Sequence, residues 1–287
     1  MSQLLKGGPV AAALNEKTAA LCAALTQRGV TPTLAVVRVG EKEDDLAYER
    51  GLLARCAKVG VAVRCFPLPE QVSQARLMEQ IQQINQDSSI HGCLLLRPLP
   101  AGLDEETVRN MLDPAKDVDG ITDASLAGLV SGSGRGRGFA PCTAQACLEI
   151  LQHYAIPLEG KRAVVVGRSL VVGRPAALLL DRANATVTVC HSRTQDLAAV
   201  CRQGDILVAA LGRAQALRSE CFRAGQVVVD VGIHVGADGK LCGDICQEDA
   251  LQADLAFTPV PGGVGAVTTA ILALHVAQAA QSASNSD

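Results

Sequence analysis

The chain has 287 residues, a formal charge of −3, 48 % apolar residues and only 2 % aromatic residues. This composition offers neither the basic patch nor the stacking side chains of a nucleic-acid-binding protein, so no nucleic-acid partner is expected. No stretch reaches membrane-spanning length free of charge, and residues 1–14 lack the pattern of a signal peptide, which favours a cytoplasmic protein without a membrane partner. The length predicts two domains or one large α/β unit.

The 11 cysteines are expected to be reduced and mostly buried, because their number is odd and no C-x-x-C pair is present. Cys242 and Cys246 lie closest together but lack a second ligand pair at metal spacing. The five histidines are scattered singly. No metal site is therefore expected.

Apolar spacing predicts alternating helices and strands in the first third of the chain. The expected helices cover 10–28, 44–59 and 73–85, and the expected strands cover 33–39, 61–66 and 90–96. This alternation is typical of an α/β fold, in which helices cover both faces of a parallel sheet. Pro98 and Pro100 end the third strand because proline cannot donate to a ladder.

The middle of the chain carries two loop signals and a connection. Asp113 to Gly120, DPAKDVDG, should bring carboxylates and a lysine to the carboxyl end of the sheet, where ligands gather in open α/β folds. Residues 131–138, SGSGRGRG, are expected to form a mobile surface loop. A helix from Pro141 to about Tyr154 then connects to the second domain.

The stretch from Ala163 to Pro175, AVVVGRSLVVGRP, has the pattern of a strand that turns sharply into a helix. Such a turn points backbone N–H groups and a helix dipole at an anion. Gly167 and Gly173 would let a pyrophosphate approach the backbone closely. The spacing is G-x-S-x-x-x-G rather than G-x-G-x-x-G, so an ordinary tight turn is the alternative.

The next expected strand, Thr186 to Cys190, ends in His191, Ser192 and Arg193. NAD enzymes place an acidic residue there, on the ribose 2′-hydroxyl. Together with Arg168, this strand end offers cations and a hydroxyl to a 2′-phosphate, which favours NADP. A solvated arginine at a strand end is the alternative.

The last third of the chain continues the α/β pattern. The short strands expected at 205–209 and 227–231 are followed by Gly212 and Gly232, which suit a backbone that approaches a bound nicotinamide. TPVPGGVG, from Thr258 to Gly265, predicts a loop fixed in one path, then a helix to about Ala280 and a disordered polar tail.

With these motifs in order, the chain closely resembles the FolD family, the bifunctional methylenetetrahydrofolate dehydrogenase/methenyltetrahydrofolate cyclohydrolases. The resemblance covers nearly the whole chain and rests on KDVDG, PCT, VVVGRSLVVGRP, TVTVCHSRT, DVGI, GD and TPVPGGVG. It implies a two-domain α/β fold, with a folate-binding domain of residues 1–120 plus 265–287 and a Rossmann-type NADP-binding domain of residues 121–264. It also implies tetrahydrofolate derivatives as substrates, a role in one-carbon metabolism and purine biosynthesis, and a homodimer.

By this resemblance Tyr48 and Asp119 lie at the reacting centre, and the Asp119 carboxylate accepts two parallel N–H bonds from the pterin ring. A turn residue that caps its own backbone is the alternative for Asp119. The other implied substrate-binding residues are Pro261, Gly262 and Gly263. The implied cofactor-binding residues are Gly167, Arg168, Ser169, Gly173, Ser192, Arg193, Gly212, Gly232 and Ile233.

The chain departs from the family's pattern in its implied active site. The family has a lysine four residues after Tyr48, where this chain has Leu52, and a glutamine in its Q-L-P-L-P motif, where this chain has Leu96. Arg97 is not expected to replace the glutamine, because adjacent strand residues point to opposite faces. The final loop reads GGVGAVT, with alanine and valine where the family usually has proline and methionine.

These departures affect two activities differently. Hydride transfer from the methylene carbon to the nicotinamide depends mainly on positioning, whereas hydrolysis of the methenyl bridge needs an activated water and a proton donor. The sequence therefore predicts an NADP-dependent 5,10-methylenetetrahydrofolate dehydrogenase whose cyclohydrolase activity is weak or lost. The alternatives are an NADP oxidoreductase of another pteridine and a degenerate, non-catalytic folate or nucleotide binder.

Overall fold

A computed structural model describes residues 2–131, 138–236 and 239–285. The chain divides into two compact units. One comprises Met1–Ala12 and Thr143–Thr268, and the other comprises Ala13–Cys142 and Thr269–Asp287. We call them the six-stranded unit and the three-stranded unit after their main sheets. The predicted two-domain α/β fold is confirmed.

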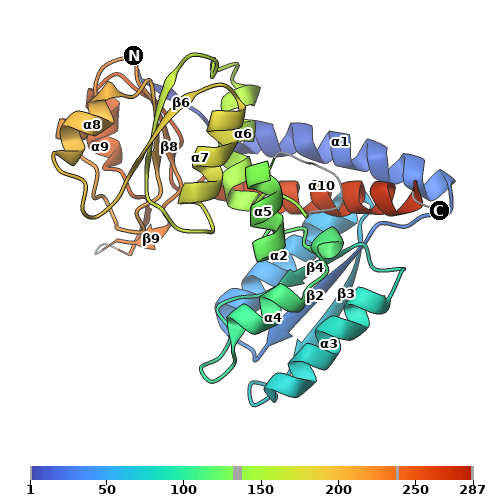
Figure 1. Ribbon diagram of the computed structural model, residues 1–287. Helices are drawn as coiled ribbons and strands as arrows, with labels where there is room; N and C mark the ends of the chain where they lie inside the picture. The colour runs from blue at the N-terminus through green and yellow to red at the C-terminus, as the bar shows by residue number, and fades with distance from the viewer. Residues whose placement is uncertain (1, 132–137, 237–238, 286–287) are drawn as a thin grey trace. The chain divides into compact units, whose positions relative to one another are not determined.

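The six-stranded unit is built on a parallel sheet with the strand order β1-β11-β8-β7-β5-β6. Its strands are β1 (Gln3–Leu4), β5 (Arg162–Val166), β6 (Thr186–Cys190), β7 (Ile206–Ala209), β8 (Val227–Asp230) and β11 (Ala256–Phe257). The helices are α6 (Cys142–His153), α7 (Gly173–Arg182), α8 (Leu197–Gln203) and α9 (Gln247–Gln252), with a 3-10 turn η2 (Ser219–Cys221). An antiparallel pair, β9 (His234–Val235) and β10 (Leu241–Cys242), lies outside this sheet (Figure 1).

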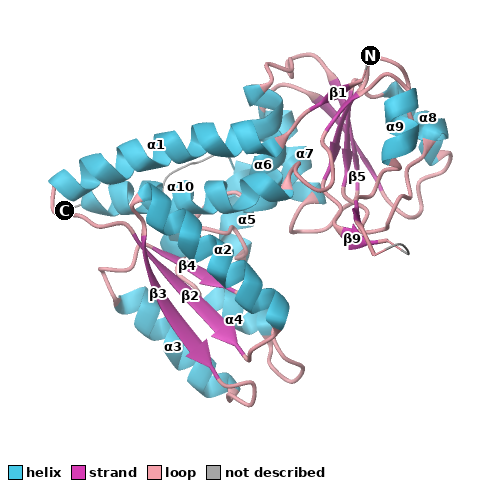
Figure 2. Cartoon of the chain, turned by 180° about the vertical axis from the view of Figure 1, so that it is seen from behind, coloured by secondary structure: helices cyan, strands magenta, loops and turns pink. Residues whose placement is uncertain are grey.

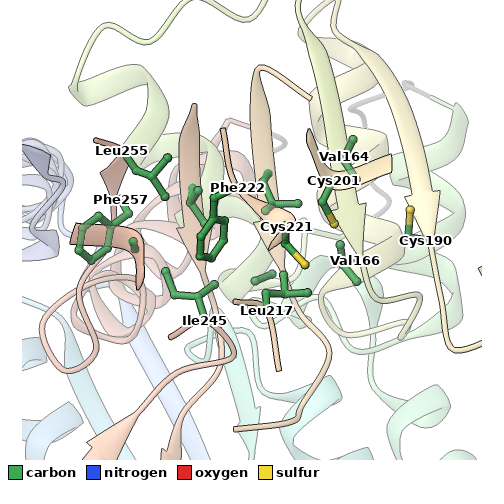
Figure 3. Packing of buried hydrophobic residues seen from close by; sticks show 14 residues of the cluster. Val164, Val166, Cys190, Cys201, Leu217, Cys221, Phe222, Ile245, Leu255 and Phe257 are labelled. Carbon is green, nitrogen blue, oxygen red and sulfur yellow. The ribbon is translucent and has the colours of Figure 1, made fainter. Parts of the chain in front are cut away.

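The core of this unit forms where the central strands are covered by helices. All four residues of β7 are buried, as expected for a parallel strand enclosed on both faces. Side chains from several elements meet in this core: Val164, Val166, Cys190, Cys201, Leu217, Cys221, Phe222, Ile245, Leu255 and Phe257 (Figure 3). All the cysteines are free, and all but Cys65 are buried, which confirms the predicted reduced and mostly buried thiols.

The three-stranded unit contains β2 (Thr33–Val39), β3 (Ala62–Leu68) and β4 (Gly92–Leu95), parallel in the order β3-β2-β4 (Figure 2). Its helices are α2 (Glu43–Val59), α3 (Gln74–Gln86), α4 (Glu105–Met111) and α5 (Asp123–Ser131), with a 3-10 turn η1 (Pro114–Lys116). One face of the sheet packs on α3 and α4, where Val37, Leu77, Ile81 and Val108 share a buried cluster.

Two long helices, α1 (Gly7–Gln27) and α10 (Gly265–Ser284), have residues in both units. Residues 1–12 group with the six-stranded unit because β1 pairs with β11: the Gln3 N–H donates to the Leu255 carbonyl at 2.9 Å. Residues 121–142 group with the three-stranded unit. This division differs from the predicted boundaries at residues 120 and 265.

Several local expectations need correction. Helix α10 continues to Ser284, so the predicted disordered tail is wrong up to that residue, and residues 286–287 lie outside the described part. In the predicted loop 131–138, Ser131 ends α5 and residues 132–137 are not described. No helix within the described ranges is long and apolar enough to cross a membrane. The same ranges hold no group of three or more His, Cys, Asp or Glu residues suited to a metal ion.

Candidate active site and cofactor site

The turn between β5 and α7 is built by two glycines that pack on each other. Gly167 has a φ angle of +134°, and a Cβ there would collide with the carbonyl oxygen of Ala210. A Cβ on Gly173 would collide with the Gly167 carbonyl oxygen. The Ser169 hydroxyl accepts from the N–H of Val172 at 3.2 Å, at the start of α7. Only glycine fits at both positions, so no side chain covers the backbone of this turn there.

A cavity of about 380 Å³ opens at this turn. Four predicted cofactor residues line it, namely Gly167, Arg168, Ser169 and Ser192. Three further polar residues line it as well, namely His191, which was named at the predicted strand end, and Thr194 and Arg213, which the sequence did not place there. Among the described residues of this lining there are two guanidinium groups and no carboxylate, a combination that suits phosphate groups.

Two further predicted cofactor residues lie next to this cavity in sequence without lining it. Arg193 is exposed, and its backbone N–H donates to His191 Nδ1 at 3.2 Å. Gly212 has a φ angle of +69° and sits in a turn between Leu211 and Arg213, which both line the cavity. Gly212 therefore shapes the lining through its backbone.

A second, smaller cavity of about 160 Å³ in the six-stranded unit joins two sets of predicted residues. Gly232 and Ile233 were expected at the cofactor, and Pro261, Gly262 and Gly263 at the folate; all five line this cavity. The Val260–Pro261 peptide is cis, and Gly262 has a φ angle of +97°. The φ angle of Gly262 lies in the left-handed region that favours glycine, so the path of the TPVPGGVG loop depends on glycine at this position.

In the three-stranded unit, α2 places Tyr48 and Leu52 one turn apart in different surroundings. Tyr48 is 41 % exposed, whereas Leu52 is fully buried. Leu96 is also buried, and its backbone N–H donates to the Val37 carbonyl at 2.9 Å. The two leucines that replace the family's lysine and glutamine are therefore enclosed apolar side chains.

Asp119 lies among groups that act on its ionisation in opposite directions. Burial raises the pKa of the Asp119 carboxyl to about 6, and Asp117 also raises it, whereas Arg97 and a hydrogen bond with the Cys142 thiol lower it. Desolvation by the surrounding protein and the nearby Asp119 raise the pKa of the Tyr48 hydroxyl. Tyr48 and Asp119, the two residues predicted at the reacting centre, thus lie within electrostatic reach of each other.

Arg97 is a cation near the candidate centre that the sequence did not place there. Its side chain is 22 % exposed and pairs with Glu105, with 3.3 Å between the nitrogen and the carboxylate oxygen. The expectation that Arg97 faces away assumed strand periodicity. That periodicity does not reach Arg97, because β4 ends at Leu95.

The DPAKDVDG segment uses most of its charged side chains to hold backbone. Lys116 Nζ donates to three main-chain carbonyls at the end of α3, at 2.7, 2.9 and 2.7 Å. Since the end of α3 leads into the start of β4, the predicted position of this lysine at the carboxyl end of the sheet is wrong. Asp113 accepts from the Ala115 N–H at 2.9 Å, and the fully buried Asp117 accepts from the Ile121 N–H at 3.0 Å. These two carboxylates perform the backbone capping that was the alternative role for Asp119.

The main chain beside Asp119 is held by Cys142 of the PCT motif and by His275, which the sequence did not single out. His275 of α10 contacts the Val118 carbonyl through Nδ1 at 2.8 Å and stacks on Phe139. Burial lowers the pKa of His275 to about 4, which leaves the ring neutral near pH 7. The Cys142 thiol lies 3.3 Å from the same carbonyl. The PCT motif pointed to Cys142, whereas no motif in the sequence pointed to His275.

Two family models match the chain, and together they cover most of it. The catalytic domain of tetrahydrofolate dehydrogenase/cyclohydrolase matches residues 5–119, and the NAD(P)-binding domain of the same family matches residues 141–284. The bifunctional protein FolD of Alkaliphilus oremlandii is 47 % identical over 279 residues, which are 97 % of each chain. This chain belongs to the tetrahydrofolate dehydrogenase/cyclohydrolase (FolD) family.

Solved FolD structures agree with this assignment. The bifunctional enzyme from Campylobacter jejuni has a TM-score of 0.93 at 35 % identity, covering 98 % of this chain and 99 % of that one. The Trypanosoma brucei enzyme, complexed with NADP and an inhibitor, has a TM-score of 0.89 at 32 % identity, covering 98 % and 97 %. The FolD resemblance predicted from the motifs is confirmed. Both cavities of the six-stranded unit fall within the NAD(P)-binding match.

Proposed function

We propose that this FolD protein is an NADP-dependent 5,10-methylenetetrahydrofolate dehydrogenase, which oxidises its substrate to the 5,10-methenyl compound. The observation that carries the proposal is the cavity at the β5–α7 turn, with its bare glycine backbone and its lining of Arg168, Ser169, Ser192 and Arg213. This lining fits the phosphates of NADP, because it combines cations and hydroxyls with a backbone that a phosphate can approach closely.

In this proposal the chain's own residues bind and orient. Gly167 and Gly173 leave room for a pyrophosphate beside the N-terminus of α7, and Arg168 and Arg213 offset the phosphate charge. NADP, when bound, supplies the nicotinamide carbon that accepts the hydride. Its 2′-phosphate meets no carboxylate among the described lining residues, which is the basis for a preference over NAD.

On the folate side, Asp119 is proposed to hold the pterin ring. The ionised carboxylate can accept two parallel N–H bonds from the 2-amino-pyrimidinone edge, a pairing that fixes both position and orientation. Tyr48 is half-exposed on α2, within electrostatic reach of Asp119, and its raised pKa keeps the hydroxyl protonated as a donor. Since hydride transfer depends mainly on positioning, this half of the reaction does not require an amine at position 52.

We infer that cyclohydrolase activity is weak or lost. Hydrolysis needs a group that moves a proton to or from water and the bridge nitrogen. Leu52 is fully buried and Leu96 is buried, and neither carries a polar atom on its side chain. Arg97 is close to Asp119, but a guanidinium stays protonated near neutrality and is a poor proton shuttle.

Two parallel assays test the proposal. Methylenetetrahydrofolate with NADP should give steady NADP reduction and accumulation of the methenyl compound. The methenyl compound, supplied alone, should disappear at close to the buffer rate. Absence of NADP reduction would disprove the dehydrogenase, and equal kcat/KM values for NAD and NADP would disprove the cofactor preference. Hydrolysis well above the buffer rate would show that another group activates the water.

We propose further that the protein is a cytoplasmic homodimer. The supporting feature is β6, an edge strand of the six-stranded sheet whose sequence TVTVC carries no charge, and in which Thr186, Thr188 and Val189 are exposed. Exposed uncharged edges favour pairing with another strand. Light scattering at micromolar concentration should give twice the chain mass. A mass of 29.7 kDa, that of one chain, would disprove the dimer.

A further inference from the structure

The carboxylate of Asp244 has a donor at every available position, although Asp244 lines neither cavity of the six-stranded unit. Its Oδ2 accepts from the N–H groups of Leu211 at 2.6 Å and Gly212 at 3.0 Å. Its Oδ1 accepts from the N–H of Arg213 at 2.9 Å and lies 2.8 Å from Nε2 of His234. A carboxylate offers about four lone-pair positions, so this one is fully used.

A second buried carboxylate fixes Asp244 itself. Asp230 Oδ1 accepts from the N–H groups of Asp244 at 2.9 Å and Gly232 at 3.0 Å, and Oδ2 accepts from the Ile245 N–H at 3.1 Å. Asp230 and Gly232 line the smaller cavity. A Cβ on Gly243 would collide with the Asp230 carboxylate, and a Cβ on Gly232 would collide with the Asp244 carboxylate, so each carboxylate packs directly on a glycine. Together they join the loops of both cavities in this unit.

The exposed half of the turn that Asp244 holds has little packing to order it. Gly212 and Arg213 are exposed, and no atom lies within 4 Å of the position that a Cβ on Gly212 would occupy. Leu211 packs against the buried cluster of this unit, so the exposed Gly212 and Arg213 are the residues whose backbone depends on the hydrogen bonds to Asp244. Burying two neighbouring carboxylates costs free energy. Their presence here indicates that the hydrogen bonds they accept from the loops are needed and could not be replaced by apolar side chains.

We propose that Asp244 and His234 are positioning residues for the cofactor. They hold the Leu211–Arg213 turn so that the Arg213 side chain faces the cavity at the β5–α7 turn, ready to meet a phosphate. His234 donates to Asp244 and completes its shell of donors. This inference rests on the NADP site proposed above. It adds the residues that fix the Leu211–Arg213 turn, which forms one wall of that site.

Variants of His234 test the proposal, since the His234 side chain is 22 % exposed and can be changed with less risk to folding than the fully buried Asp244. His234→Leu removes the donor to Asp244, and His234→Gln keeps an N–H donor at a similar reach. His153→Leu is the matched control, because His153 is an exposed histidine of the same unit that lines neither cavity. The readout is the Kd for NADP by calorimetry without folate, at a temperature well below the unfolding midpoint of every variant.

His234→Leu should raise the Kd for NADP by about tenfold, the effect of a lost contact to a charged group. His234→Gln and the control should bind as the unmutated protein does. A purely structural role for His234 would lower the unfolding temperature and leave the Kd unchanged, and that result would overturn the proposal. Equal weakening by His234→Gln and His234→Leu would overturn it as well.

A double-mutant cycle with Arg213→Ala shows whether His234 acts through the turn. Arg213→Ala should weaken NADP binding in the unmutated background and much less in His234→Leu, where the arginine is already displaced. Additive effects would overturn the proposal. NADP binding that is present but insensitive to His234→Leu contradicts this inference alone, whereas no NADP binding by the unmutated protein contradicts the proposed function too.

Discussion

Arg97 lies close enough to Asp119 to lower the pKa of its carboxyl, in opposition to the burial that raises this pKa to about 6. The arginine follows the end of β4, and the aspartate belongs to the segment that runs beside β4 through the bridge between Cys93 and Asp117. The charge of the residue proposed to hold the pterin thus depends on a balance in which burial raises the pKa of its carboxyl and Arg97 is the first of the groups that lower it.

Substrate affinity should therefore depend on pH near 6. Only the ionised Asp119 can accept two N–H bonds, so the affinity should rise as the pH increases through about 6 and be lost below it. Arg97→Leu should shift this midpoint to higher pH, because burial then acts without the opposing cation. Tetrahydrofolate titrations by calorimetry across this range measure it. Arg64→Leu, which removes an exposed arginine from the same unit, should leave the midpoint in place.

Arg168→Ala should reduce the preference for NADP over NAD by roughly tenfold to a hundredfold, the effect of losing a charge-assisted contact of about 1.5 to 3 kcal/mol. Arg193→Ala should reduce it less, because Arg193 does not line the cavity at the β5–α7 turn. The ratio of kcat/KM for the two cofactors measures the preference. A larger effect at Arg193 would show that its side chain, and not that of Arg168, meets the 2′-phosphate.

Gly167→Ala should prevent stable folding of the six-stranded unit or abolish cofactor binding. The methyl group would collide with the Ala210 carbonyl oxygen, and the φ angle of +134° is unsuited to alanine, so we expect a cost of at least about 2 kcal/mol. Gly8→Ala is the control, because no atom lies within 4 Å of its Cβ position. It should be neutral or stabilise α1 by up to about 1 kcal/mol. Thermal unfolding of both variants, with NADP titration, distinguishes these outcomes.

Leu52→Lys combined with Leu96→Gln should restore some cyclohydrolase activity. Leu52→Lys alone places an ammonium at a fully buried position without an amide partner, so it should lower the unfolding temperature and fail to hydrolyse the methenyl compound. The control is Leu52→Met with Leu96→Met, which keeps both positions apolar. If the double Lys/Gln variant folds and remains inactive, loss of these two side chains does not explain the missing hydrolysis.

Most strands and the cofactor turn could be predicted because their signals are local. The β-branched run before Gly167 is a buried parallel strand, and the sharp turn that follows needs glycine at positions visible in the sequence. The same holds for the central strand β2, whose seven residues are mostly apolar and all buried. In these segments a run of apolar residues, with the glycine that ends it, is sufficient to predict the strand and its end.

The remaining features depend on contacts distant in sequence. Nothing near Lys116 indicates that its ammonium caps α3, because the three carbonyls that it contacts lie about thirty residues earlier. The position of Arg97 depends on where β4 ends, and strand ends are poorly defined by composition. The donors around Asp244 come from a turn and a short strand that only the folded chain brings together.

The pairing of β1 with β11 has a consequence for how the protein is made. Gln3 and Leu4 are translated some 250 residues before their partners, Ala256 and Phe257. β1 can therefore pair with β11 only after the whole three-stranded sheet has been translated. A nascent chain cannot finish one unit before it begins the other, as chains with simply consecutive domains do. Fragments cut at any single point should lack part of at least one unit.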